Sequence, residues 1–298
     1  MLHKTVLLNE TIDNLNLKED GVLLDCTLNS GGHSEEASKR LGGKLKIVGI
    51  DLDSQALKKA AENLAKCNAN FILKEASFRD LDKVLSELNI QKVDAIIFDL
   101  GLSSNQLEES GRGFTFQKNE PLLMTFKQNP EESDLTAKDI VNNWDKENIE
   151  QILLSYGEER FAKRIAEKIV EKREEKPIET TFELVEIVRS AMPKSLQRGK
   201  INPATKTFQA LRITVNDEIR ALKEGLEKGF NHLNKEGRMA VISFHSLEDR
   251  IVKIYFKELD KSGVGKNIVK KPIVPNRAEI LENPRSRSAK LRIIERII

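Results

Sequence analysis

Short apolar runs alternate with helix-like segments between residues 22 and 99, and this rhythm restricts the fold more than any other feature of the chain. The apolar runs are 22–27, 46–50, 70–74 and 93–98. The segments with helical spacing between them are about 35–41, 54–65 and 80–88. Alternation of this kind predicts βαβ units that build a parallel sheet. We therefore expect an α/β fold whose ligand site lies beyond the carboxyl ends of the strands.

Polar residues follow three of the four predicted strands. The first strand reaches Asp25 and runs into a turn that contains Gly31 and Gly32, the second ends on Asp51, and the fourth ends on Asp99. The carboxyl ends of parallel strands share one edge of a sheet, so these groups are expected to meet there. Their placement predicts one pocket for a nucleoside-bearing cofactor.

Two cofactors suit a glycine-rich turn followed by an acid about 20 residues later, as in Gly31 and Asp51: a dinucleotide and S-adenosylmethionine. The turn lacks the G-x-G-x-x-G fingerprint of dinucleotide sites. The helix after it opens with Glu35 and Glu36, which would repel a pyrophosphate but not a sulfonium cation. The residues therefore favour S-adenosylmethionine. Taken singly, each residue also has a purely structural explanation: the glycines in a tight turn and Phe78 in the core.

The strand–helix rhythm stops after Asp99 and returns near residue 238. The intervening chain reads as a long loop over 105–135, followed by helices over about 147–155, 158–173, 182–191 and 204–233. A strand over 238–244, a helix over 247–259 and a strand over 290–298 follow. We predict one α/β domain, formed by 1–109 and 211–298, that is interrupted by an inserted helical domain over 110–210.

The composition narrows the setting. The 298 residues carry a net charge of +2, which excludes a generally polycationic coat, so an anionic partner must be met by local patches. Two cysteines and four scattered histidines indicate neither a disulfide framework nor a metal site. No apolar stretch approaches the ~20 residues that cross a bilayer. A cytoplasmic protein without a membrane partner is the expectation.

Nine stretches, taken in order from residue 3 to about 296, resemble the bacterial ribosomal RNA small subunit methyltransferase H family, RsmH or MraW. They are HKTVLLNE at 3–10, GGHS at 31–34, DLGLSSNQL at 99–107, RGFTF at 112–116, YGEER at 156–160, NPAT at 202–205, FQALRI at 208–213, ISFHSLEDRIVK at 242–253 and NPRSRSAKLR at 283–292.

The resemblance implies a class I, Rossmann-like methyltransferase fold with an inserted substrate-recognition domain. It also implies methyl transfer from S-adenosylmethionine to the 4-amino group of a cytidine in 16S ribosomal RNA, at the decoding centre. Carried over by position, the cofactor contacts are Gly31, Gly32, His33, Asp51, Phe78, Asp99 and Gln106. We expect the substrate to be the RNA within the assembled small subunit. The sequence leaves open whether the protein is a homodimer.

The chain departs from the family pattern at several positions. A glycine of the family is Asn29 here, the segment 121–127 lacks two acids and an arginine, and a histidine and an arginine become Asn202 and Lys206. These changes leave two alternatives open: a related methyltransferase with another amine substrate, and a factor in ribosome assembly that binds the cofactor or RNA without transfer. A nicotinamide oxidoreductase is a more distant alternative.

Two residues are candidates for the chemistry itself. Asp99 is placed to accept hydrogens of the target amine, and His245, just after a strand, can accept a proton or stack on the base. Phe114, Phe116 and Phe244 are candidates to receive a flipped base. The candidate RNA-binding cations are Lys194, Arg198, Lys200, Arg285, Arg287, Lys290 and Arg292.

Overall fold

The computed structural model describes residues 4–102, 107, 110–195, 197 and 202–298, and these residues form two compact units. The first unit comprises residues 1–101 and 219–298, and the second comprises residues 102–218. The second unit therefore begins and ends several residues outside the predicted insertion, 110–210. Each apolar core cluster lies within one unit.

The first unit contains a seven-stranded sheet in the order β3-β2-β1-β4-β5-β7-β6. Its strands are β1 (Val22–Asp25), β2 (Lys46–Asp51), β3 (Asn70–Glu75), β4 (Val93–Asp99), β5 (Leu233–Ser243), β6 (Gly265–Asn267) and β7 (Lys290–Arg296). The first five strands pair in parallel, and β7 runs antiparallel to β5 and β6. This is the predicted Rossmann-like α/β architecture.

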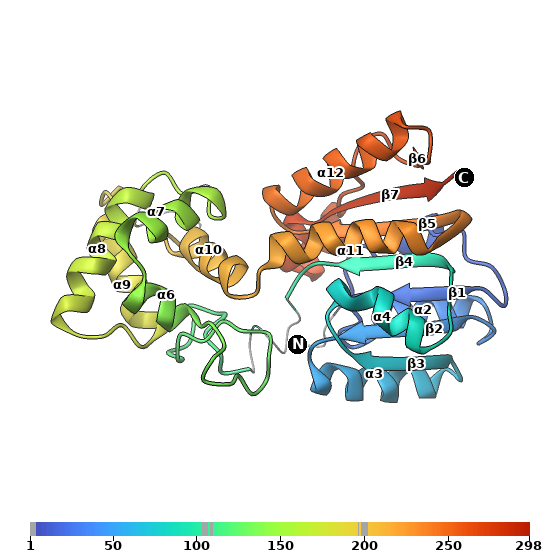
Figure 1. The fold of residues 1–298 in the computed structure, drawn as a ribbon, viewed down its shortest axis with the longest axis horizontal. Coiled ribbons are helices and arrows are strands. Elements are labelled where there is room, and N and C mark those ends of the chain that lie inside the picture. Colours follow the sequence, from blue (N-terminus) through green and yellow to red (C-terminus); the bar gives the residue numbers. More distant parts are fainter. Residues whose placement is uncertain (1–3, 103–106, 108–109, 196, 198–201) are drawn as a thin grey trace. The chain divides into compact units, whose positions relative to one another are not determined.

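Helices cover both faces of the sheet because the central strands are apolar on both sides. Along β4, Ile96 and Phe98 join one core cluster, and Ala95 and Ile97 join the other. The first cluster is completed from α4 (Leu81–Glu87), α11 (Glu218–His232) and α12 (Ser246–Lys261). The second is completed from α1 (Leu8–Asn14), α2 (Gly32–Arg40) and α3 (Ser54–Lys66) (Figure 1).

Short elements complete the first unit. They are the 3-10 turn η1 (Phe78–Asp80), α13 (Arg277–Glu282) and the 3-10 turn η2 (Pro284–Ser288). None of the helices within the described residues combines the length and the apolar character that a membrane crossing requires.

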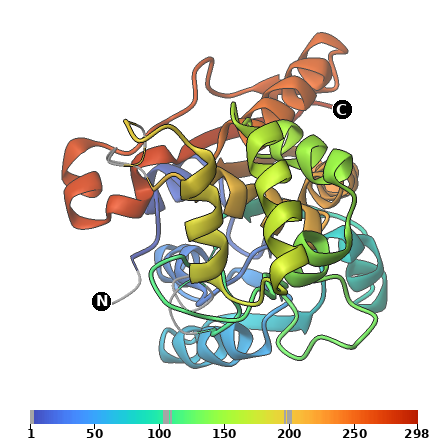
Figure 2. The ribbon, with the colours of Figure 1, turned by 90° about the vertical axis from the view of Figure 1, so that its left-hand side faces the viewer.

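The second unit is helical (Figures 1 and 2). Its helices within the described residues are α6 (Ala137–Asn143), α7 (Lys146–Ser155), α8 (Ala162–Glu175), α9 (Thr181–Ala191) and α10 (Thr205–Val215). The predicted capping box at Thr180 and Glu183 is present, and α6, which the sequence analysis missed, opens with a second box at Thr136 and Asp139.

The predicted long helix over 204–233 is wrong. The helix is interrupted between α10 and α11, where Asp217 adopts a left-handed φ of 47°. The Asn216 side chain donates to the carbonyl of Met124 at 2.7 Å and accepts from the amide of Phe126 at 2.8 Å. Helical periodicity on both sides hid this break, because its cause is a contact with residues about 90 positions earlier in the chain.

Candidate active site at the carboxyl edge of the sheet

The candidate site lies where the order of the parallel strands reverses. β1 pairs with β2 on one side and with β4 on the other, so the chain leaves the ends of β1 and β4 in different directions. Ligands of open α/β sheets bind at such a switch point. Asp25, Asp51 and Asp99 are the last residues of β1, β2 and β4, and they therefore share this edge.

The turn after β1 requires glycine at two positions. Gly31 has a φ of 80°, in the left-handed region that disfavours side chains, and it immediately precedes α2. At Gly32, an added Cβ would lie only 1.9 Å from Thr5 Oγ1. The Thr5 side chain can approach the backbone of residue 32 this closely only without a side chain at position 32. The structure therefore places both predicted glycines in the tight turn at the end of β1.

Asn29, the departure from the family glycine, occupies a second left-handed position of the same turn. Its φ is 49°, and asparagine tolerates this region better than other residues with a side chain. The Asn29 amide donates to Asp51 Oδ2 at 2.7 Å. The substitution therefore keeps the turn conformation that a glycine would adopt.

Asp51 links this turn to the end of β2. The side chain is buried, and it accepts hydrogen bonds from the amides of Asn29 at 2.7 Å and Asp53 at 2.9 Å. Burial raises the pKa of Asp51 to about 6, although the backbone hydrogen bonds oppose this shift. Asp53, rather than Asp51, caps α3 by accepting from the amides of Gln55 and Ala56. Asp51 is therefore not needed as the helix cap.

Asp25 lies at this edge of the sheet, as its place at the end of the first predicted strand indicated, although it was not among the predicted cofactor contacts. It is buried at the end of β1 and accepts a 2.7 Å hydrogen bond from Ser34 Oγ. Burial raises its pKa to about 6, and the charge of Asp51 contributes to the increase. Its position as an acid that ends a strand was the available signal.

Asp99 is the most perturbed of the three carboxyl groups. Burial, followed by the charges of Asp25 and Glu248, raises its pKa to about 7. Its Oδ1 atom is buried and has no hydrogen-bond partner among the described residues. The Asp99 amide donates to Thr27 Oγ1 at 2.6 Å, which fixes the backbone at the end of β4. The side chain therefore retains capacity to accept hydrogen bonds.

His33 lies against Asp99. It is buried in the first turn of α2, and its Nδ1 atom is 4.0 Å from Asp99 Oδ2. Its Nε2 atom is 3.1 Å from the carbonyl of Val6, so the N-terminal segment holds the ring in place. A ring held by Nε2–H presents Nδ1 toward the carboxyl group.

Phe78 lies beyond the end of β3, in the turn η1. Its ring packs edge-on against Phe98, with the ring centroids 5.6 Å apart, and Gly225 leaves room for it. The ring is half-buried. It thus contributes to the core and retains an exposed part beyond the strand end. Gln106, the remaining predicted cofactor contact, lies outside the described residues.

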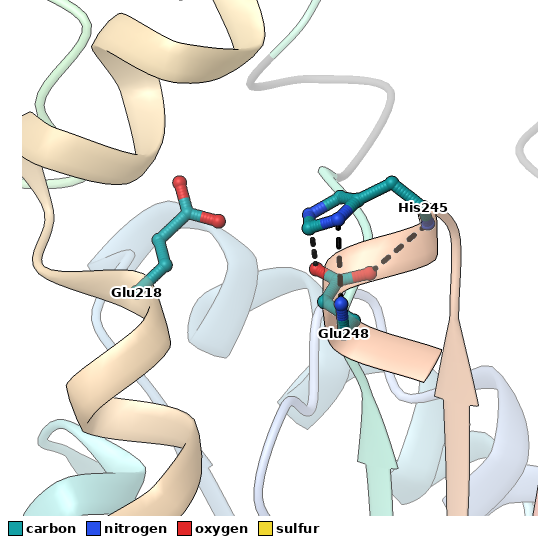
Figure 3. Close-up of side chains that lie close together, drawn as sticks. All are labelled: Glu218, His245 and Glu248. Carbon is teal, nitrogen blue, oxygen red and sulfur yellow. Dashed lines mark hydrogen bonds and ion pairs between the residues drawn. The ribbon is translucent and has the colours of Figure 1, made fainter. Parts of the chain in front are cut away.

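His245 is the N-cap of α12, directly after β5 (Figure 3). Its Nδ1 atom accepts from the Glu248 amide at 3.4 Å, and its Nε2 atom lies 3.0 Å from Glu248 Oε1. Glu248 Oε2 in turn accepts from the amides of Phe244 at 2.8 Å and His245 at 3.3 Å. This reciprocal arrangement is a capping box, so His245 has a structural role at the edge of the site.

The donor set can be tested against the expected cofactor. Asp25 and Asp51 are buried, Asp99 is partly buried, and all three have raised pKa values. The Oδ1 atom of Asp99 is buried and has no hydrogen-bond partner among the described residues. A cofactor with a positive sulfonium, an ammonium group and ribose hydroxyls supplies cations and hydrogen-bond donors to such a set. A pyrophosphate would add negative charge to it. The residues therefore fit S-adenosylmethionine and disfavour a dinucleotide.

Comparisons with known proteins agree with this chemistry. The model of the MraW methylase family matches residues 1–297. The ribosomal RNA small subunit methyltransferase H of Clostridium botulinum (strain Kyoto / Type A2) is 51% identical over an alignment that covers 99% of each chain. The protein of the same name from Lachnospira eligens is 44% identical, over 99% of this chain and 98% of its own.

Proposed function

Because the chain belongs to the MraW methylase family, we propose that it transfers a methyl group from S-adenosylmethionine to the 4-amino group of a cytidine in 16S ribosomal RNA. The relatives named as methyltransferases of small-subunit ribosomal RNA support the RNA substrate. The observation that carries the proposal within the structure is the set of three carboxyl groups, all with raised pKa values, at the switch point of the sheet. The proposal goes beyond the names of these relatives in two respects: the location at the decoding centre and the cytosine 4-amino group as the methyl acceptor.

The exocyclic amine of cytosine is a weak nucleophile because its lone pair is delocalised into the ring. When bound, the cofactor supplies an electrophilic methyl group on a positively charged sulfur. The protein must orient the amine and accept the proton that leaves nitrogen as the new bond forms. Asp99 is suited to this role, because its Oδ1 atom is buried and unpartnered among the described residues and its pKa is about 7.

The same carboxyl edge offers acceptors for the rest of the cofactor. We assign Asp51 to the ribose hydroxyls, Gly31 and Gly32 to close backbone approach, and Phe78 to contact with the adenine. His33 sits beside Asp99 and holds that side of the turn. The placement of these residues beyond the ends of β1, β2 and β3 supports the roles that the family resemblance implies.

For His245, a direct role in proton transfer stays a prediction. Both of its ring nitrogens face atoms of Glu248, which favours a role in positioning the chain after β5. The structure also describes the surroundings of the three aromatic residues that are candidates to receive a flipped base. Phe114 stacks on Phe126 and Phe116 packs edge-on against Phe208 in the helical unit. Phe244 lies at the end of β5, where its ring contacts Gly101.

Labelled methyl transfer tests the proposed function. Small ribosomal subunits that lack the modification are incubated with the protein and methyl-labelled S-adenosylmethionine, and the ribosomal RNA is then digested and analysed by mass spectrometry. We expect the label in 4-methylcytidine or its 2′-O-methylated form. Cofactor binding with label in another amine would indicate a changed substrate. Cofactor binding without transfer to subunits or to free RNA would favour an assembly factor.

A further inference from the structure

The segment 268–289, which we call the rim, joins β6 to β7 and contains α13 and η2. Because β7 runs antiparallel to β5, its first residue, Lys290, pairs with Ser243, the last residue of β5. The rim therefore reaches the edge of the sheet at which the parallel strands end. In Figure 2 it is the red segment beside the N-terminal part of the chain.

The two acids of the rim are used to attach it to the N-terminal segment. Glu279 Oε1 accepts from the amide of Leu7 at 2.8 Å, and Glu282 forms an ion pair with Lys4. The Asn283 side chain adds a 3.0 Å hydrogen bond to the carbonyl of Lys4. These contacts fix the orientation of the rim on the first unit.

The N-terminal segment in turn packs on the turn after β1. Thr5 fills the space above Gly32, and the carbonyl of Val6 lies 3.1 Å from His33 Nε2. Only residues 4–7 therefore lie between the rim and the glycine turn of the candidate active site. An RNA held by the rim would be held next to that site.

Four cations of the rim lack an acidic partner among the described residues. Lys270, Lys271, Arg277 and Arg287 are exposed, and none of them forms an ion pair with a residue that the structure describes. Elsewhere, exposed lysines commonly pair with a local acid. Examples are Lys39 with Glu35, Lys44 with Glu19, and Lys172 with Glu175. The inward use of Glu279 and Glu282 thus leaves a positive outer surface.

Two large apolar side chains are exposed on the same segment. Val274 is 57% exposed and Leu281 is 73% exposed, the latter being the most exposed of the large apolar residues that the structure describes. Cations without an acidic partner can bind the phosphates of a nucleic acid, and exposed apolar side chains beside them can pack on its sugars or bases. The candidate cations Lys290 and Arg292 do not extend this surface, because both pair with Asp249, at 2.9 and 2.7 Å.

We propose that the rim is a docking surface for the sugar–phosphate backbone of the RNA next to the target nucleotide. Arg277 and Arg287 are its principal phosphate-binding groups, with Lys270 and Lys271 beside them. The inference rests on the proposed function, since it assigns a surface to the RNA substrate of that reaction. It predicts that the rim contributes to the binding of RNA and leaves the binding of the cofactor unchanged.

The test compares two double variants of the full chain. Arg277→Gln with Arg287→Gln removes two charges from the rim, and Lys257→Gln with Lys261→Gln removes two exposed charges from the part of α12 remote from the strand ends. For each protein, the affinity for 16S ribosomal RNA and for small subunits is measured over a range of salt concentrations. The dissociation constant of S-adenosylmethionine and the thermal midpoint verify the cofactor site and the fold.

For the rim variant we expect RNA affinity to fall about tenfold near 0.1 M salt, and the slope of log affinity against log salt to become shallower by about 2. The control variant should match the wild type. An unchanged slope and affinity in the rim variant would overturn the inference, even if the wild type methylates cytidine. A loss of binding to subunits but not to protein-free RNA would also overturn it, because the rim would then contact a ribosomal protein. Failure of the wild type to transfer methyl groups would instead count against the proposed function.

Discussion

Three carboxyl groups at one sheet edge determine how the candidate site responds to pH. Burial raises the pKa of Asp25 and Asp51 to about 6 and that of Asp99 to about 7, from an ordinary value of 3.8. Between pH 4 and pH 7 the folded state therefore binds more protons at these groups than the unfolded state. Their contribution to stability is complete below about pH 4 and is lost as the pH rises through 6 to 7.

Cofactor binding should show the opposite trend. S-adenosylmethionine carries a positive sulfur that favours ionised carboxylates, whereas the product S-adenosylhomocysteine does not. We expect the affinity for S-adenosylmethionine to fall on the order of tenfold between pH 7.5 and pH 5.5, and the affinity for the product to fall less. Calorimetric titration with both ligands at both pH values measures this difference. Equal pH dependence for the two ligands would contradict the assignment of the carboxyl groups to the cofactor.

The two roles of His245 can be separated by substitution. Asparagine is a good N-cap and alanine is a poor one, so His245→Asn keeps the helix cap and loses the imidazole, whereas His245→Ala loses both. If the ring only caps α12, His245→Asn should retain most of the transfer rate, and His245→Ala should lose about 1 kcal/mol of stability. Single-turnover rates and denaturant unfolding are the measurements. A large loss of rate in both variants with normal stability in His245→Asn would assign the ring a direct role.

At the scale of elements, the turn after β1 shows what local sequence can predict. Gly31 and Gly32 indicated a tight turn, and its hydrogen bonds and φ values agree with that prediction. The reason for Gly32 could not be predicted, because the atom that excludes a side chain is Thr5 Oγ1, from a separate segment. By contrast, the capping function of His245 depends on Glu248, which follows only three residues later, so the sequence already contained both members of this capping box.

Asn29 provides a test of that turn. Because its φ is 49°, we expect Asn29→Gly to leave stability within about 0.5 kcal/mol of the wild type, and Asn29→Ala to lower it by about 1 kcal/mol. Both variants keep the backbone amide that donates to Asp51. Urea unfolding of the two variants gives the comparison. If Asn29→Ala proved as stable as Asn29→Gly, backbone conformation would not explain the residue at this position.

For the whole molecule, periodicity predicted the parallel part of the sheet well. The predicted strands 46–50, 70–74 and 93–98 each agree with β2, β3 and β4 to within one residue at either end. The pattern failed where a distant contact decides the structure, as at the break near Asp217. The loop predicted over 105–135 is non-regular between residues 110 and 135, but the pattern did not predict that Leu122 and Met124 within it join the core. Those two residues are fully buried in the helical unit, and backbone bonds to Glu179 and Arg112 hold them there.

The departures from the family pattern in the helical unit also have structural explanations. Asn202 accepts from the amide of Ala204 at 2.9 Å before α10 begins, and Lys206 donates to the carbonyl of Glu158 at 2.7 Å. Both residues therefore have local partners within the fold.

The most direct test of the account is the single-turnover rate of methyl transfer to small subunits by the wild type and by Asp99→Asn, with each protein saturated with cofactor. The substitution keeps the size of the side chain and removes its capacity to take a proton. We predict that formation of 4-methylcytidine slows by about 10²- to 10⁴-fold, the usual contribution of a general base, while the thermal midpoint stays close to that of the wild type. A rate within threefold of the wild type would contradict the central role that we give to Asp99.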